Sequence, residues 1–128
     1  MTPEETIRAF AGAMNDRDIE ALMSYYDEDS ALVVKLGTHL KGRDPIRKAL
    51  ESVFPLEPNV VIHRVDAIES AEVAMCLVES TFKGTSPKGR AIVRPQRSVD
   101  VLRRQSDGRW LFAVDNAPGT TVFDEEGA

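Results

Sequence analysis

The sequence predicts an α+β domain in which three N-terminal helices pack on a curved, mainly antiparallel sheet. Two observations predict this fold. Apolar residues recur at helical spacing as far as Phe54, and β-branched residues dominate after Pro58. Helices followed by a run of strands, without strand–helix–strand alternation, indicate helices gathered on one face of an antiparallel sheet. At 128 residues the chain is expected to form one domain, 1–128.

The first helix is predicted to begin at Pro3. Thr2 supplies a capping hydroxyl, proline suits the first helical position, and Glu5 completes a capping box. The apolar face of this helix consists of Ile7, Phe10, Ala11 and Met14.

A second helix is expected after Asn15–Asp16, which interrupts the first run and can cap the next. Its apolar positions are Ile19, Leu22, Met23 and Tyr26. The acidic run Asp27–Asp29 would place negative charge at a helix C-terminus, where the helix dipole disfavours it. We therefore expect a solvated loop at these three residues.

A short hairpin is predicted from Ala31–Val34 and Thr38–Lys41, with its turn at Gly37. Asp44–Pro45 then opens a third helix, whose apolar residues follow the helical period as far as Phe54. Two prolines beyond it end the helix.

Long strands make up the rest of the chain. They are predicted at Val60–Ile68, Val73–Phe82, Ile92–Arg104 and Trp110–Asn116. Asp107–Gly108 is a strong hairpin signal between the last two strands. Pro95 cannot donate to a strand ladder, so its strand should be at an edge there or bulged. Residues 124–128 are expected to be a frayed, disordered tail.

Composition excludes several classes of function. A net charge of −5 without a basic stripe argues against nucleic-acid binding, and no apolar run is long enough to span a membrane. With no secretory signal, a cytoplasmic protein is expected. Cys76 is the only cysteine and sits in an apolar run, which indicates a buried core residue. His39 and His63 lie far apart, so no metal site is expected.

Three separated motifs carry a family resemblance. Segments within Thr6–Ala31, Gly42–Arg47 and Asp107–Leu111 resemble the helical opening, third-helix start and final hairpin of SnoaL-like and ketosteroid-isomerase-like proteins. The last part, 101–116, is most similar to the SgcJ/EcaC branch. The resemblance implies the cone-shaped fold shared with nuclear transport factor 2 and a single pocket. It does not identify a reaction, because this superfamily hosts many.

The same resemblance argues against two chemistries. Ketosteroid isomerases need a carboxylate base, plus a tyrosine and a protonated aspartic acid that bind the oxyanion. Alignment by eye places Phe10, Val34 and Arg97 at these positions, so all three roles are lost. The sequence also contains no Gly-x-Gly-x-x-Gly dinucleotide fingerprint, and we expect no cofactor.

Asp115 is the candidate catalytic residue, because SnoaL-like cyclases resemble this chain in carrying an acid late in the last strand. Burial in an apolar cone would raise its pKa into a range that suits proton transfer. Successive side chains of a strand point to opposite faces, so there are two alternatives for which residues of the last strand point into the cone. If Trp110 and Phe112 face the core, Asn116 points inward. If these aromatic residues instead form a dimer contact on the outer face, Asp115 lines the cone, and we favour this alternative.

Five further residues are candidates for ligand binding. They are Tyr25, His39, Glu79, Arg97 and Asn116. Arg97 could bind an anion or pair with a carboxylate, and Glu79 is a second acid. The Tyr25 hydroxyl could cap the pocket, and His39 could lie at its mouth. Each of these residues could equally be an ordinary surface or core side chain.

The favoured function is that of a small-molecule pocket protein that forms a homodimer through the sheet face. The activity considered for it is that of a cofactor-free isomerase, cyclase or hydrolyase for a mostly apolar substrate. The alternative is a non-catalytic ligand-binding or dimerisation module of the same fold. The pocket discriminates between them, since a cone completely filled by methionine and phenylalanine would exclude catalysis. The residues in question are Met14, Met23, Phe54 and Met75.

Overall fold

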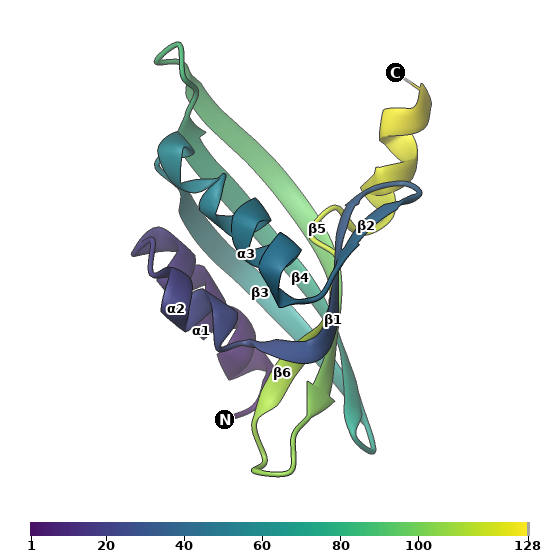
Figure 1. The fold of residues 1–128 in the computed structure, drawn as a ribbon. Coiled ribbons are helices and arrows are strands. Elements are labelled where there is room, and N and C mark those ends of the chain that lie inside the picture. Colours follow the sequence, from purple (N-terminus) through teal and green to yellow (C-terminus); the bar gives the residue numbers. More distant parts are fainter. Residues whose placement is uncertain (128) are drawn as a thin grey trace.

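A computed structural model describes residues 1–127 and places the helices before most of the strands (Figure 1). The elements in chain order are α1 (Pro3–Asn15), α2 (Ile19–Met23), β1 (Tyr26–Lys35), β2 (Thr38–Lys41), α3 (Arg43–Glu51), the 3-10 helix η1 (Phe54–Leu56), β3 (Asn59–Ser70), β4 (Val73–Thr85), β5 (Ala91–Arg104), β6 (Trp110–Asp115) and the 3-10 helix η2 (Gly119–Gly127).

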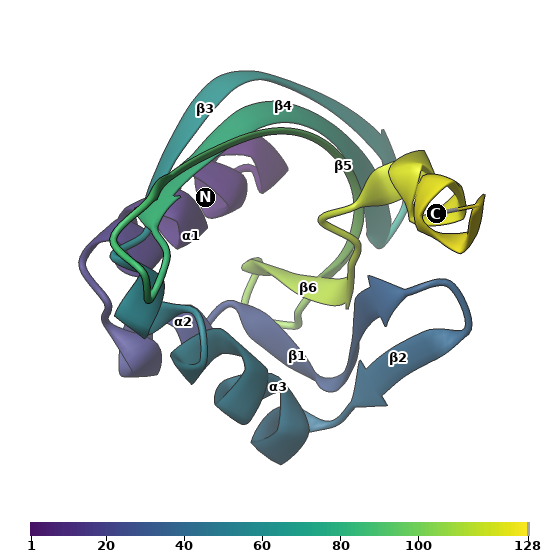
Figure 2. The ribbon, with the colours of Figure 1, turned by 90° about the horizontal axis from the view of Figure 1, so that it is seen from above.

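The strands form one sheet in the order β2-β1-β6-β5-β4-β3. All neighbours pair antiparallel except β1 and β6, which are parallel. Seen from above, β3, β4 and β5 bend into an arch, and α1, α2 and α3 lie on its concave side (Figure 2). The predicted α+β class, with three N-terminal helices on a curved and mainly antiparallel sheet, is confirmed.

Local signals explain where the helices begin. The Thr2 hydroxyl accepts from the Glu5 amide at 3.1 Å, and the Thr2 amide donates to the Glu5 carboxylate at 2.8 Å, so the predicted capping box is present. The second helix is capped by Asp18, which accepts from the Ala21 amide, rather than by Asn15–Asp16. The cap lies later because Arg17 adopts a left-handed conformation in the turn.

The second helix is shorter than the sequence predicts. It ends at Met23, and Tyr26 is the first residue of β1 rather than the last turn of a helix. The cause is a hydrogen bond of 2.7 Å from the Phe112 amide to the Tyr25 carbonyl, which joins this segment to β6. The Tyr26 side chain is still buried in the core, where helical spacing also placed it.

The acidic run Asp27–Asp29 belongs to β1, and the prediction of a solvated loop is wrong. The Asp27 carboxylate is buried and bound by Arg103 at 3.0 Å and Gln105 at 2.9 Å. Burial acts to raise the pKa of this carboxyl, but hydrogen bonds from the Asp29 amide, Gln105 and Arg103 hold the pKa below its usual value. The Arg103 guanidinium and the Gln105 side-chain amide therefore stabilise a negative charge on Asp27 within the sheet.

Pro95 lies where β5 has a strand partner on one side only. The β4–β5 ladder runs the length of β5, whereas β6 pairs only with Val101–Arg104. The predicted edge position is confirmed.

The C-terminal end lies outside the sheet. η2 extends as far as Gly127 and so overlaps 124–128, the predicted tail, of which residue 128 lies outside the described residues. Within the described chain, no helix has the length and apolarity needed to cross a membrane.

Gly119 is required where η2 leaves the sheet. It adopts φ +57°, and a Cβ atom there would collide with the Arg97 carbonyl oxygen of β5. We predict that Gly119→Ala lowers the free energy of unfolding by about 1–3 kcal/mol. Gly89→Ala is the control, because Gly89 also has positive φ but open space around it. Equal losses of stability in urea unfolding would contradict the steric argument.

Candidate active site

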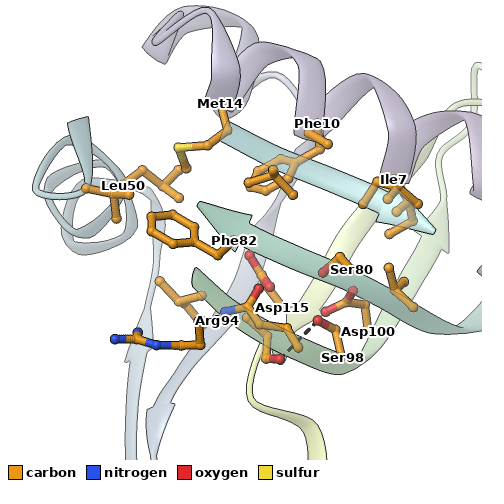
Figure 3. Close-up of a pocket in the computed structure, with 18 of the residues that line it drawn as sticks. Ile7, Phe10, Met14, Leu50, Ser80, Phe82, Arg94, Ser98, Asp100 and Asp115 are labelled. Atoms are coloured by element: carbon orange, nitrogen blue, oxygen red, sulfur yellow. Dashed lines mark hydrogen bonds between the residues drawn. The ribbon is translucent and has the colours of Figure 1, made fainter. Parts of the chain in front are cut away.

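A cavity of about 310 Å³ lies between the helices and the concave face of the sheet (Figure 3). Its helical wall is apolar and is formed by Ile7, Phe10, Ala11, Met14, Ala49, Leu50 and Val53. Its strand wall carries the polar side chains Ser80, Arg94, Gln96, Ser98, Asp100 and Asp115. The cone is therefore not filled. Met14 lines the cavity, whereas Met75 points to the outer face of the sheet.

A bulge in β6 decides which residues of the last strand face this cavity. Leu102 pairs with Phe112 but Val101 pairs with Val114, so Ala113 is an extra residue in the ladder. The bulge reverses the side-chain alternation, and both Phe112 and Asp115 line the cavity.

The arrangement with Phe112 facing inward is therefore correct before the bulge, and the arrangement with Asp115 facing inward is correct after it. Asp115 lines the cavity and Asn116 does not. The placing of Trp110 and Phe112 on an outer dimer face is wrong, because they are only 5% and 2% exposed and belong to the core.

Asp115 is the centre of a hydrogen-bonded group of three buried side chains. The Tyr26 hydroxyl donates to Asp115 Oδ2 at 2.5 Å. The carboxyl of Asp100 adjoins that of Asp115, so that one of the two can donate to the other when it is protonated. The other side of Asp100 is fixed by the Asn116 amide, which donates to Oδ1 at 2.8 Å. β1, β5 and β6 each contribute one side chain to this acid group, which we define as Tyr26, Asp100 and Asp115.

Burial sets the protonation of the acid group. It raises the pKa of Asp100 well above the usual value, and the neighbouring Asp115 charge adds to the rise. Burial also raises the pKa of Asp115, against the opposing hydrogen bonds from Tyr26 and Asp100. The pKa of Tyr26 is raised well above its usual value, first by burial and then by Asp115. The favoured state has neutral Asp100 and Tyr26 donating to an Asp115 carboxylate.

This arrangement can transfer a proton to or from a bound molecule. The Asp115 carboxylate is held in an apolar cavity, where it is poorly solvated and available as a base. Asp100 supplies a proton beside it, as expected when two adjacent carboxyls cannot both ionise.

Comparison with known proteins identifies the family and agrees with the fold. A family model described as a SnoaL-like domain matches residues 7–112. The chain belongs to the SnoaL-like family. A search of curated proteins found no match.

Solved structures similar to this SnoaL-like domain share its fold. One from Novosphingobium aromaticivorans, provisionally named a scytalone dehydratase, has 17% identity and TM-score 0.78 over 88% of this chain and 77% of that chain. Another from the same organism, provisionally named an aromatic ring hydroxylase, has 21% identity and TM-score 0.78 over 88% and 82%. An uncharacterised protein with a cystatin-like fold from Caulobacter vibrioides has 18% identity and TM-score 0.74 over 96% and 92%. At these identities the likeness shows the fold alone.

The five residues that the sequence offers for ligand binding lie outside the cavity lining of the SnoaL-like domain. Tyr25 packs against the core, and His39 is exposed on β2. Asn116 accepts from the Gly119 amide at 3.1 Å through its side chain. Strand parity places Glu79 and Arg97 on the outer face, where they pair with each other at 3.7 Å.

The three ketosteroid-isomerase positions contribute no polar group to the cavity. Phe10 lines it with an aromatic ring, Val34 is exposed on β1, and the Arg97 side chain is 82% exposed. Sequence reasoning missed Tyr26 and Asp100, which hold Asp115.

Cys76 is buried as predicted. Burial raises the pKa of its thiol to about 12.

Asp100→Asn should alter how stability depends on pH. The pKa of Asp100 in the folded protein is raised above the unfolded value of about 3.9. The contribution of Asp100 to the free energy of unfolding is therefore fully present when the pH is below this unfolded value. The contribution is lost as pH rises through the folded pKa. Asparagine mimics the neutral acid, so the stability of the variant relative to wild type should increase from pH 4 to pH 8, on the order of 1–2 kcal/mol.

Urea unfolding across this pH range measures the difference. Asp107→Asn is the control of opposite sign, because hydrogen bonds from Arg109 lower the pKa of Asp107. Its relative stability should increase as pH falls through the acidic range. Parallel curves for Asp100→Asn and wild type would contradict the assignment of a raised pKa to Asp100.

Proposed function

We propose that this SnoaL-like domain is a cofactor-free acid–base enzyme that moves a proton on a small, mostly apolar substrate, in the manner of an isomerase, cyclase or hydrolyase. The observation that carries the proposal is the acid group at one end of an otherwise largely apolar cavity. Buried carboxyls of this kind are costly to stability, and they concentrate at functional sites.

Each residue of the acid group has a distinct role in this proposal. Asp115 is the catalytic base, since its carboxylate lines the cavity. Asp100 carries the proton that returns to the substrate or stabilises developing negative charge. Tyr26 is a positioning residue, because its hydroxyl contacts Asp115 and does not line the cavity.

The provisional name of one structural relative is compatible with this chemistry. Dehydration removes a proton from carbon and protonates a leaving hydroxyl, which a pair of carboxyls sharing one proton can do. A cavity of 310 Å³ is at the small end of the range for small-molecule sites. Membership of the SgcJ/EcaC branch and a cytoplasmic location stay predictions from the sequence.

Proton transfer can be tested without knowing the natural substrate. Nitrobenzisoxazole opens its ring when a base removes one proton from carbon, and a poorly solvated carboxylate accelerates this reaction. We expect the wild-type domain to catalyse the ring opening and Asp115→Asn to lower kcat/KM by about 100-fold or more. The rate should increase with pH as the acid pair ionises.

Asp66→Asn is the matched control, because Asp66 lies on the outer face of β3 and does not line the cavity. It should leave the rate unchanged. A wild-type rate no higher than that of Asp115→Asn would refute the enzymatic proposal and favour the alternative, a non-catalytic ligand-binding module.

We also propose that the outer face of the sheet joins two copies of the chain. Exposed apolar side chains gather there in adjacent strand positions, and Val99 and Val101 adjoin them on β5. The exposed members are Ile68, Val73, Met75 and Leu77. Contiguous apolar surface of this kind marks an interaction site, and one patch facing itself gives a two-fold dimer.

Leu77→Arg should convert the dimer into a monomer, because it places two like charges at the centre of the interface. Sedimentation at micromolar concentration measures the change. Val34→Arg is the control, since Val34 is 48% exposed, compared with 40% for Leu77, but belongs to the β1–β2 hairpin. A monomeric wild type would exclude the dimer and leave the cavity proposal untouched.

A further inference from the structure

One column of side chains on β5 gives the cavity a polar edge. Alternate residues from Arg94 to Asp100 line it, namely Arg94, Gln96, Ser98 and Asp100. The first and the last are six residue steps apart along the strand, which corresponds to about 20 Å of backbone. An apolar ligand would cover these polar side chains without offering them hydrogen-bond partners, so the column indicates a ligand with polar groups at several points.

Much of this edge is free to bind a ligand. Ser98 donates to the Ala117 carbonyl at 3.0 Å. Among the side chains of residues 1–124, the hydrogen bonds include none from the Gln96 amide or the Ser80 hydroxyl. Because both side chains line the cavity, a bound molecule would satisfy them.

Arg94 is the cationic end of the edge. Other arginines on this sheet pair with carboxylates, as Arg97 does with Glu79 and Arg103 does with Asp27. For Arg94, no carboxylate of residues 1–124 lies within ion-pair distance. Its side chain is exposed, yet it lines the cavity.

The two ends of the cavity carry opposite charge. In the close-up view the Arg94 guanidinium and the Asp100 carboxyl lie on opposite sides of the cavity (Figure 3). An anionic group would be repelled by the Asp115 carboxylate at the inner end and attracted by Arg94 at the outer end. Because the whole chain carries a net charge of −5, it offers no general attraction for anions, and Arg94 would supply a local one.

We infer that the cavity takes amphiphilic organic anions, with the acidic group at Arg94, the apolar body against the helices and a hydrogen-bonding edge along Gln96 and Ser80. This inference deepens the proposed function, on which it rests, by naming the substrate class. Arginine suits the outer end, since its planar guanidinium binds carboxylate, sulfonate or phosphate through paired hydrogen bonds.

Two fluorescent probes of similar shape test the inference. Anilinonaphthalene sulfonate carries an anionic group, and N-phenylnaphthylamine has nearly the same aromatic body without charge. We expect Arg94→Gln to weaken binding of the sulfonate about tenfold and to leave binding of the neutral probe unchanged. Added salt should weaken sulfonate binding to wild type more than to Arg94→Gln.

Two further variants locate the probes. Arg97 lies on the same strand as Arg94, but its side chain is on the outer face. Arg97→Gln should therefore change the affinity for neither the sulfonate nor the neutral probe. Ala49→Phe places a larger side chain in the cavity from a half-buried position on α3, and it should weaken the binding of both probes.

Sulfonate affinity that is insensitive to Arg94→Gln overturns the anion inference. If Ala49→Phe still excludes the neutral probe in that case, the cavity remains a small-molecule site and the proposed function stands. If Ala49→Phe affects neither probe, the cavity does not admit ligands, and both proposals are overturned.

Discussion

A carboxylate can remain at the closed end of an apolar cavity only if hydrogen bonds replace the water that it has lost. Tyr26 and Asp100 supply these bonds to Asp115, and they come from strands at opposite ends of the chain. The Tyr26–Asp115 bond joins residues 89 positions apart. It lies beside the parallel pairing of β1 with β6, so the ladder that closes the cone also brings the acid group together.

Local patterns in the sequence were sufficient for most of the fold. The capping box at Thr2, the hairpin around Gly37 and the turn at Asp107–Gly108 each depend on neighbouring residues only, and the structure contains all three elements. The resemblance across 101–116 drew attention to Asp115. What could not be read locally was the environment of Asp115, which depends on how distant strands pair.

Two features explain why the sequence did not predict which side chains of β5 and β6 face the cavity. Nothing in the run around Ala113 marks the bulge, yet this one residue changes which side chains of β6 face the cavity. On β5 the usual pattern is reversed, because Val99 and Val101 face outward while Asp100 is buried. A reader who assigns apolar residues to the interior therefore places Asp100 on the surface. An Asp flanked by valines in a long strand, in a chain with an apolar outer face, would be the signal to look for.

The alternation along β5 separates two kinds of surface on a single strand. Between Ile92 and Asp100, side chains of even number line the cavity, and those of odd number belong to the outer face that also carries Met75 and Leu77. Point substitutions can therefore retune ligand preference while the outer surface stays intact, which makes this strand a suitable place for directed evolution. Insertion or deletion of one residue would exchange the two sets, so natural homologues should vary in side chains here but keep the length of the strand constant.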